Sequence, residues 1–273
     1  MKTFLRGLAA LCLSVGVTSQ ARAQEYTFTT IEPFGSNGST ASGITDDGQI
    51  VGNYGDGNGI HGFLLSGGTY STLDGPGIRY TIAWGINLSG EIVGWYNDSS
   101  FRLHGFLLSD GDYTTLDAPD STYTLPSGIN AGGQIVGTYN NHGFLLSEGS
   151  YTTLDVPGSN STYAYGINDV GEIVGGYDGH GFLLSQDGYA TIDVPDSTGT
   201  AARGINNVGQ IVGEYYAAGK WHGFVWSAGG LTTLDVPGSI STTAFGINGR
   251  GEIVGQYRDA SNNAHGFLAT PMK

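Results

Sequence analysis

Six histidines give the first chemical signal in this 273-residue sequence, because each stands directly before Gly-Phe. Each of the first five is followed 13 residues later by an aspartate, a spacing that a hairpin would convert into adjacent positions on two strands. A histidine can bind a metal, transfer protons or hold a carboxylate in a structural hydrogen bond. The histidines are His61, His104, His142, His180, His222 and His265, and the expected partners are Asp74, Asp117, Asp155, Asp193, Asp235 and, for His265, Glu32.

The histidines belong to a repeat of about 40 residues. Six segments follow the pattern Gly-Ile-Asn/Thr-x-x-Gly-x-Ile-Val-Gly-x-Tyr, and they begin 42, 43, 38, 38 and 42 residues apart. Between that tyrosine and the next histidine lie 6, 7, 2, 2, 6 and 7 residues, which accounts for all the variation in spacing. One loop in each unit therefore absorbs every insertion. The segments begin at Gly43, Gly85, Gly128, Gly166, Gly204 and Gly246.

Each unit predicts four short strands. The first ends in Gly-Ile-Asn, the second is Ile-Val-Gly-x-Tyr, the third is His-Gly-Phe-Leu-Leu-Ser and the fourth resembles Tyr-Thr-Thr-Leu-Asp. Asn-x-x-Gly predicts a tight turn between the first two, and pairs such as Gly-Gly or Asp-Gly predict two-residue hairpins between the last two. Four strands in about 40 residues, repeated six times, predict an all-β, six-bladed β-propeller.

The two ends of the chain predict how the ring closes. The last unit stops after its third strand, and the stretch that begins at Tyr26 has the fourth-strand pattern. We therefore expect the N-terminal strand to complete the sixth blade, so that residues 24–273 form a single propeller domain. The alternative is an open β-solenoid, which would not need complementary ends.

Strand geometry restricts the chemistry of the histidines. They occupy the third strand from the axis, which places them on the order of 10 Å or more from it at about 4.8 Å per strand. Zinc–nitrogen bonds are about 2.0–2.1 Å long, so the blades cannot share one ion. A catalytic group is also rarely repeated in six copies. We expect six structural His–carboxylate pairs, with a metal site inside a single blade as the alternative.

Residues 1–23 have the pattern of a cleaved signal peptide. Lys2 and Arg6 precede an apolar run, and Ala21-Arg22-Ala23 matches a signal-peptidase site. Cys12 is the only cysteine, so the mature chain would have no disulfide. We expect a secreted protein, either extracellular or periplasmic. No later apolar run approaches the roughly 20 residues of a membrane-spanning helix, so we expect no membrane insertion.

The charge of the chain disfavours nucleic acid as a partner. The sequence has 10 basic and 24 acidic residues, a formal net charge of −14. Removing the three basic residues of the leader leaves 7 basic and 24 acidic residues. Binding to nucleic acid requires lysine and arginine to neutralise phosphates, and this composition offers few of them.

The repeat resembles the HAF repeat family of extracellular bacterial repeat proteins. The resemblance rests on Gly-Ile-Asn-x-x-Gly-x-Ile-Val-Gly, on His-Gly-Phe where the family has His-Ala-Phe, and on Tyr-Thr-Thr-Leu-Asp-Val-Pro-Gly, and it covers roughly residues 26–270. It implies an exported protein with a propeller-like fold. It implies no particular activity, so no functional residues are carried over from it.

Two sets of non-repeated residues are the candidates for ligand binding. The first occupies one variable position before each Gly-Ile-Asn, on the strand nearest the axis, where aromatic rings and an arginine could hold a sugar. The second lies in the variable loops, where scaffolds commonly carry binding residues. The first set has a structural alternative, since its side chains could simply fill space between blades. The loop residues could serve a partner protein as well as a sugar. The candidates are Trp84, Tyr165, Arg203 and Phe245 near the axis, and Phe101 and Trp221 in the loops.

Three kinds of function fit this pattern. We favour a non-catalytic binding or interaction module for an extracellular carbohydrate or protein, because no unrepeated His or Cys offers an acid–base group. A propeller lyase or hydrolase with a site in the central depression is the second possibility, and an architectural envelope or matrix protein is the third. We expect no cofactor. Calcium is an alternative ligand for loop aspartates, although no EF-hand or RTX repeat is present.

Overall fold

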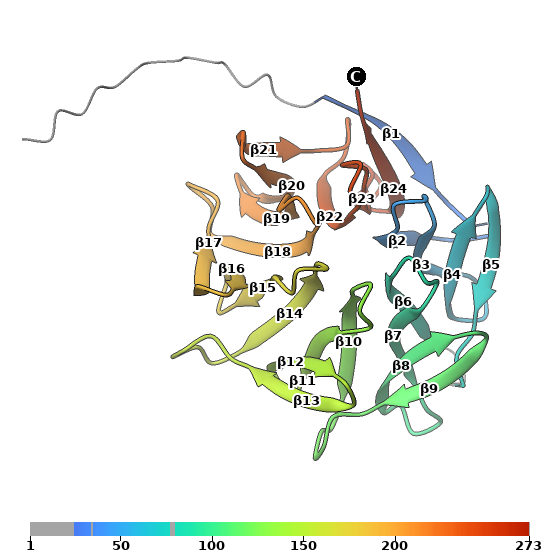
Figure 1. Cartoon of the computed structure of the whole chain (residues 1–273). Helices are drawn as coiled ribbons and strands as arrows, with labels where there is room; N and C mark the ends of the chain where they lie inside the picture. Colours follow the sequence, from blue (N-terminus) through green and yellow to red (C-terminus); the bar gives the residue numbers. More distant parts are fainter. Residues whose placement is uncertain (1–24, 34, 77–79, 273) are drawn as a thin grey trace, which may run out of the picture.

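Six four-stranded antiparallel sheets form a ring in the computed structural model, which describes residues 25–33, 35–76 and 80–272 (Figure 1). These residues contain 24 strands and no helix. The predicted six-bladed β-propeller is therefore confirmed. The predicted signal peptide, residues 1–23, lies outside the described residues.

Blades 1–5 each use four strands that are consecutive in the sequence, and blade 6 combines the two ends of the chain. Blades 1 to 3 comprise β2 (Ser39–Ile44), β3 (Ile50–Gly55), β4 (Ile60–Ser66) and β5 (Thr69–Leu73); β6 (Thr81–Ile86), β7 (Ile92–Asn97), β8 (Leu103–Ser109) and β9 (Asp112–Leu116); and β10 (Thr124–Ile129), β11 (Ile135–Tyr139), β12 (His142–Ser147) and β13 (Ser150–Leu154). Blades 4 to 6 comprise β14 (Thr162–Ile167), β15 (Ile173–Tyr177), β16 (His180–Ser185) and β17 (Gly188–Ile192); β18 (Gly199–Ile205), β19 (Ile211–Ala217), β20 (Lys220–Ser227) and β21 (Gly230–Leu234); and β22 (Ser241–Ile247), β23 (Ile253–Arg258), β24 (Ala264–Pro271) and β1 (Tyr26–Ile31).

The N-terminal strand closes the ring, as the sequence predicted. Strand β1 pairs antiparallel with β24 from Tyr26 opposite Pro271 to Ile31 opposite Gly266. Phe28 packs edge-to-face on the buried Phe267, with ring centroids 5.8 Å apart. The fourth strand of blade 6 is therefore supplied from the opposite end of the chain.

The two-residue hairpins follow the predicted chemistry in three blades. Both turn residues have positive φ in Gly67-Gly68, Asp110-Gly111 and Glu148-Gly149, which is the type I′ pattern. In blades 4 and 5 the positive φ falls instead on the next residue, Gly188 or Gly230. The type I′ turn is therefore not formed in those two blades.

The glycine of each Gly-Ile-Asn segment lets the inner strands approach one another at the axis. A Cβ atom on Gly85 would lie 2.8 Å from the carbonyl oxygen of Ser127 in the next blade, and one on Gly246 would lie 2.8 Å from that of Ser42. Any side chain there would push neighbouring blades apart. The repeated glycine thus sets the tight inner circumference of the ring.

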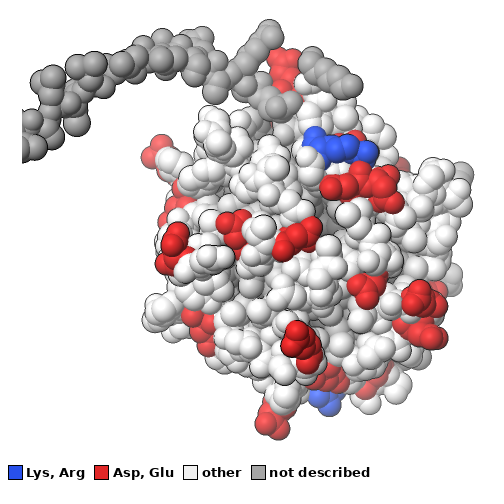
Figure 2. All heavy atoms as spheres, viewed as in Figure 1, with Lys and Arg blue, Asp and Glu red and all other residues white. Residues whose placement is uncertain are grey.

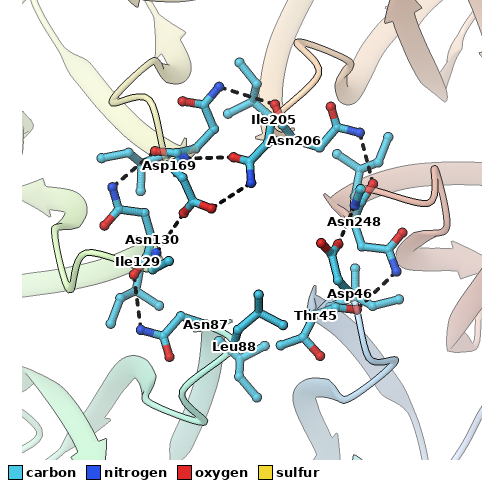
Figure 3. A pocket seen from close by; sticks show the side chains of 18 residues that line it. Thr45, Asp46, Asn87, Leu88, Ile129, Asn130, Asp169, Ile205, Asn206 and Asn248 are labelled. Carbon is cyan, nitrogen blue, oxygen red and sulfur yellow. Dashed lines mark hydrogen bonds between the residues drawn. The ribbon is translucent and has the colours of Figure 1, made fainter.

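Asparagine side chains connect neighbouring blades around one end of the axis, which we call the turn face because it carries the Asn-x-x-Gly turns (Figure 3). Each amide nitrogen donates to the main-chain oxygen of the equivalent residue in the next blade, at 3.0–3.3 Å. The series runs from Asn87 to Asn130, Asn168, Asn206, Asn248 and finally Thr45. Blade 1 has Thr45 in place of asparagine, so the series ends there.

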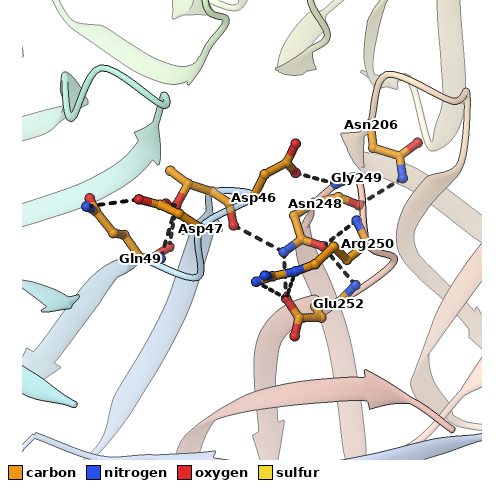
Figure 4. Close-up of polar contacts among 9 residues, drawn as sticks. Asp46, Asp47, Gln49, Asn206, Asn248, Gly249, Arg250 and Glu252 are labelled. Carbon is orange, nitrogen blue, oxygen red and sulfur yellow. Dashed lines mark hydrogen bonds and ion pairs between the residues drawn. The ribbon is translucent and has the colours of Figure 1, made fainter. Parts of the chain in front are cut away.

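The junction of blades 6 and 1 has further polar contacts on the turn face (Figure 4). The main-chain nitrogen of Gly249 donates to Asp46 at 2.6 Å, beside the bond from Asn248 to the oxygen of Thr45 at 3.1 Å. Arg250 pairs with Glu252 of its own blade at 2.7 Å. Ring closure is therefore stabilised at the inner strands as well as at β1.

Candidate functional site

The structure brings all six predicted His–carboxylate pairs into contact. The donor or acceptor atom of the histidine is Nδ1 in every pair, and five pairs have distances of 2.7–3.0 Å. The pairs are His61–Asp74, His104–Asp117, His142–Asp155, His180–Asp193, His222–Asp235 and His265–Glu32. Their structural role stays a prediction.

Each histidine ring also packs against the ring of the tyrosine directly opposite it on the second strand of the blade. Ring centroids of Tyr215 and His222 are 5.0 Å apart, and the other five pairs lie within 5.7 Å. Loop length decides how far each pair is shielded. The His104 side chain under a seven-residue loop is 15% exposed, whereas His142 beside a two-residue loop is 49% exposed.

In three blades a loop aspartate contacts the remaining nitrogen of the histidine. Nε2 lies 3.3 Å from Asp56 for His61, 3.4 Å from Asp98 for His104 and 3.3 Å from Asp259 for His265. These imidazoles therefore lie between two carboxylates. Among the described residues, no three His, Cys, Asp or Glu side chains have an arrangement that could hold a metal ion.

We predict that two of these histidines make stability depend on pH. The hydrogen bond to Asp74 raises the pKa of His61; burial lowers the pKa of His265, but Glu32 and Asp259 outweigh it and raise the pKa overall. A raised folded-state pKa contributes stability that is complete below the unfolded value of about 6.5 and is lost as pH rises through the folded value. The unfolding free energy should therefore fall from about pH 6 to about pH 9.

Denaturant unfolding at both pH values checks this expectation. The double variant His61→Gln/His265→Gln should show a smaller difference between the two pH values, because it lacks both titrating groups. A pH dependence equal to that of the unmodified chain would contradict the assignment to these two histidines.

Asp98 and Asp259, two of the loop aspartates considered as calcium ligands, are bonded within their own loops. Asp98 accepts main-chain N–H groups of Ser100 at 2.8 Å and Arg102 at 3.0 Å, and Asp259 accepts those of Ser261 and Asn263. Hydrogen bonds from Asn263 lower the pKa of Asp259 to about 2. These carboxylates thus order the loops, and calcium binding stays a prediction.

The variable position on each inner strand is the extra residue of a β-bulge. In blade 1, Ala41 pairs with Gly52 and Gly43 with Val51, so Ser42 has no partner in the ladder, and the other five blades repeat this irregularity. A bulge redirects a side chain out of the normal alternation. The six bulge residues all line one axial cavity of about 80 Å³, and they are Ser42, Trp84, Ser127, Tyr165, Arg203 and Phe245.

The axial cavity is closed above blade 1. Trp84 and Phe245 come from the two blades that flank blade 1, and their rings meet edge-to-face with centroids 5.3 Å apart. Ser42, on the blade between them, is only 3% exposed. Toward the turn face, six isoleucines separate this cavity from the asparagine side chains that connect the blades. They are Ile44, Ile86, Ile129, Ile167, Ile205 and Ile247.

The face of the ring opposite the turn face carries the variable loops, and we call it the loop face. On this face a groove of about 420 Å³ adjoins the axial cavity, with which it shares Trp84, Ser127, Tyr165 and Arg203. The groove spans blades 2, 3 and 4 and reaches Arg203 of blade 5. Loops 140–141 and 178–179, the two shortest, belong to blades 3 and 4. Its lining comprises Trp84, Trp95, Leu103, Tyr123, Leu125, Ser127, Thr138, Asn141, Tyr163, Tyr165 and Arg203.

Several polar groups of the groove have no hydrogen-bond partner among the described residues. They include the indole nitrogens of Trp84 and Trp95 and the amide nitrogen of Asn141. The Asn141 side chain is oriented by the Tyr123 hydroxyl, which donates to its amide oxygen at 2.9 Å. The groove therefore offers aromatic faces together with hydrogen-bond donors.

The sequence did not single out three of the aromatic residues in this groove. Trp95 lies at the variable position of Ile-Val-Gly-x-Tyr, and Tyr163 lies two residues before the bulge residue Tyr165. Variation within an otherwise fixed repeat would have identified Trp95, since the six blades carry different residues there. Tyr123 belongs to a connection between blades, where the repeat gives no such signal.

Phe101 and Trp221, the two loop candidates, are not part of the groove. Phe101 is 72% exposed at positive φ in its loop. Trp221 is 40% exposed and packs edge-to-face on Tyr216 at 5.3 Å. Of the six candidate ligand residues, the structure thus gathers Trp84, Tyr165 and Arg203 in the groove, with Phe245 beside them at the axis.

No family model and no curated protein sequence matches this chain. Among solved structures, a streptogramin B lyase has a TM-score of 0.51 at 11% identity, covering 90% of this chain and 98% of that one. A mutant Aleuria aurantia lectin in complex with Fucα1-6GlcNAc has a TM-score of 0.51 at 12% identity, covering 90% and 97%. A mutant of AofleA from Arthrobotrys oligospora has a TM-score of 0.52 at 13% identity, covering 92% and 90%. At such identities the likeness shows the shared fold alone, a β-propeller that is compatible with a binding module.

The described part of the chain holds no helix with the length and hydrophobicity needed to span a bilayer.

On the face drawn in Figure 2, acidic side chains are spread over several blades, with few lysines or arginines among them.

Proposed function

We propose that this protein is an exported, non-catalytic binding module that holds a carbohydrate in the groove over blades 2–4. Five aromatic side chains border the groove, which is within the usual size range of ligand sites. Aromatic faces pack on the C–H faces of sugar rings, while indole N–H and amide groups bond their hydroxyls. The observation that carries the proposal is this combination of aromatic walls and unpartnered donors.

The chemistry of the lining favours binding over catalysis. Among the described residues that border the groove there is no Asp, Glu, His or Cys. General acid–base catalysis most often uses such a side chain within hydrogen-bond reach of the reacting atoms. The carboxylate nearest to the arginine of the groove, Glu214, is itself bonded to Arg203 and Thr243.

A panel of neutral and acidic oligosaccharides, tested on the chain from residue 24 onward, checks the proposal. We expect saturable changes in tryptophan fluorescence and a higher melting temperature with at least one oligosaccharide, because a ligand of the folded state adds stability. Trp95→Ala should weaken binding roughly tenfold, the effect of losing one stacking surface.

Trp226→Ala is the matched control, since Trp226 is 36% exposed on β20 and does not border the groove. It should leave the affinity unchanged. Equal losses in the two variants would place the ligand elsewhere. Absence of binding throughout a broad panel would overturn the carbohydrate proposal.

A further inference from the structure

Arg203 is the only cationic residue among the described residues that border the groove. In a chain with a net charge of −14, such an arginine would ordinarily indicate a site for an anionic ligand. The contacts of its guanidinium group show a different arrangement. Nε and Nη2 both donate to Oε1 of Glu214, with the Nε distance at 3.1 Å.

The pair is held in place from both sides. The second oxygen of Glu214 accepts the hydroxyl of Thr243 from blade 6 at 2.7 Å. The guanidinium carbon lies 4.2 Å from the centroid of the Tyr165 ring and 5.8 Å from that of Phe245. The side chains of Arg203 and Glu214 are only 20% and 12% exposed. Tyrosine and phenylalanine thus cover a guanidinium whose charge is already balanced.

We infer that the groove selects uncharged saccharides and discriminates against uronic acids, and that Glu214 is the residue that determines this specificity. The inference rests on the proposed carbohydrate-binding function and names the ligand class of the same site. A ligand carboxylate placed near Arg203 meets the carboxylate of Glu214, which already balances the charge of the guanidinium. The ligand carboxylate loses its hydration without gaining an unpaired cation. A neutral hydroxyl has no such cost.

Arg102, a described cation beside the lining in the sequence, does not alter this balance. Arg102 adjoins the lining residue Leu103, but its side chain donates to the main-chain oxygen of Ser121 at 2.9 Å. It is exposed and does not border the groove.

The repeat itself provides a conservative substitution that tests the role of Glu214. The equivalent positions in the other blades are all uncharged, and blade 6 has glutamine there. Glu214→Gln therefore introduces a side chain that this strand position already accepts. The other five residues are Asn53, Trp95, Thr138, Gly176 and Gln256.

The experiment compares two ligands that differ by one group: a neutral oligosaccharide that binds, and the same oligosaccharide with one hydroxymethyl oxidised to carboxylate. Calorimetry at pH 7 and low salt gives both affinities. For the unmodified chain we expect the neutral form to bind at least tenfold tighter. In Glu214→Gln that ratio should fall roughly tenfold, because one charge-assisted hydrogen bond becomes available to the carboxylate.

Two further variants separate the local effect from net charge and folding. Glu172→Gln makes the same change on the turn face, at a position where blade 3 has Gln134, and should leave the ratio as it is. Arg203→Met/Glu214→Gln should show no gain for the carboxylate, because the freed cation is absent. Melting curves establish that each variant is folded.

The outcomes distinguish failure of the specificity inference from failure of the proposed carbohydrate-binding function. Saccharide binding with equal or tighter affinity for the carboxylate in the unmodified chain overturns the inference and leaves the proposed function standing. An equal change of the ratio in Glu214→Gln and Glu172→Gln also overturns it. Binding of neither oligosaccharide, in a chain that binds no other saccharide, overturns both.

Discussion

A chain that begins at residue 35 should lose cooperative folding at temperatures where the chain from residue 24 is fully folded. The truncated chain lacks β1, and with it the burial of Ile31, which is 5% exposed, and the packing of Phe28 on Phe267. Two such side chains contribute roughly 3–6 kcal/mol. The total stability of a domain is only about 5–15 kcal/mol, so the loss should approach all of it. Circular dichroism melting curves measure the effect.

Two observations accompany the truncation. A synthetic peptide of residues 24–34 should raise the melting temperature of the truncated chain in proportion to its occupancy, because it replaces the missing strand. The exposed edge of β24 should also promote aggregation in the absence of the peptide. A truncated chain that melts like the longer one would contradict the role of β1 in closing the ring.

Gly175→Ala should cause the largest loss of stability among single alanine substitutions of neighbouring glycines. A Cβ atom at Gly175 would lie 2.0 Å from the carbonyl oxygen of Tyr163 and 2.5 Å from the ring of the fully buried Phe182. Neither group can move away without displacing the inner strand or the core of the blade. Overpacking of this kind costs about 1–3 kcal/mol and more where backbone must shift, so we expect about 3 kcal/mol or more.

The adjacent Gly176→Ala is the matched control. A Cβ atom there would meet its nearest neighbours at 3.5 Å, an ordinary contact distance. We expect a change within about 1 kcal/mol, because alanine suits a strand at least as well as glycine. Equal effects of the two substitutions in denaturant unfolding would show that the close approach at Gly175 is not a determinant of stability.

The sequence alone determined the repeat and, through it, the fold. When the variable loop is subtracted from the spacing between repeats, 36 residues remain in every unit, which is enough for four short strands. The unpaired third strand at one end of the chain matched the spare fourth strand at the other. The partners of the histidines followed from the same periodicity, since a spacing of 13 residues and a short hairpin place His142 beside Asp155. Such features depend on local strand geometry, which repeated spacing reveals.

The tertiary structure alone decided the composition of the groove. Trp95 and Tyr163 come from different blades and Tyr123 from the connection between blades 2 and 3, so their approach depends on how the blades are inclined around the axis. The bulge at each inner strand adds one residue to a ladder whose side chains otherwise alternate, and a one-residue shift reverses the face of every later side chain. Sequence spacing within a strand carries no mark of that shift.

The clearest difference concerns Arg203. The sequence presented it as an arginine near the axis of an acidic protein, free to hold a hydroxyl or a carboxylate. The structure pairs it with Glu214, 11 residues away on the neighbouring strand, and fixes that glutamate through Thr243 of the next blade. Composition and periodicity report which charges are present, whereas the availability of a charge depends on contacts between strands and blades. For this protein the order of the strands was therefore readable from the sequence, and the charge of the groove only from the folded ring.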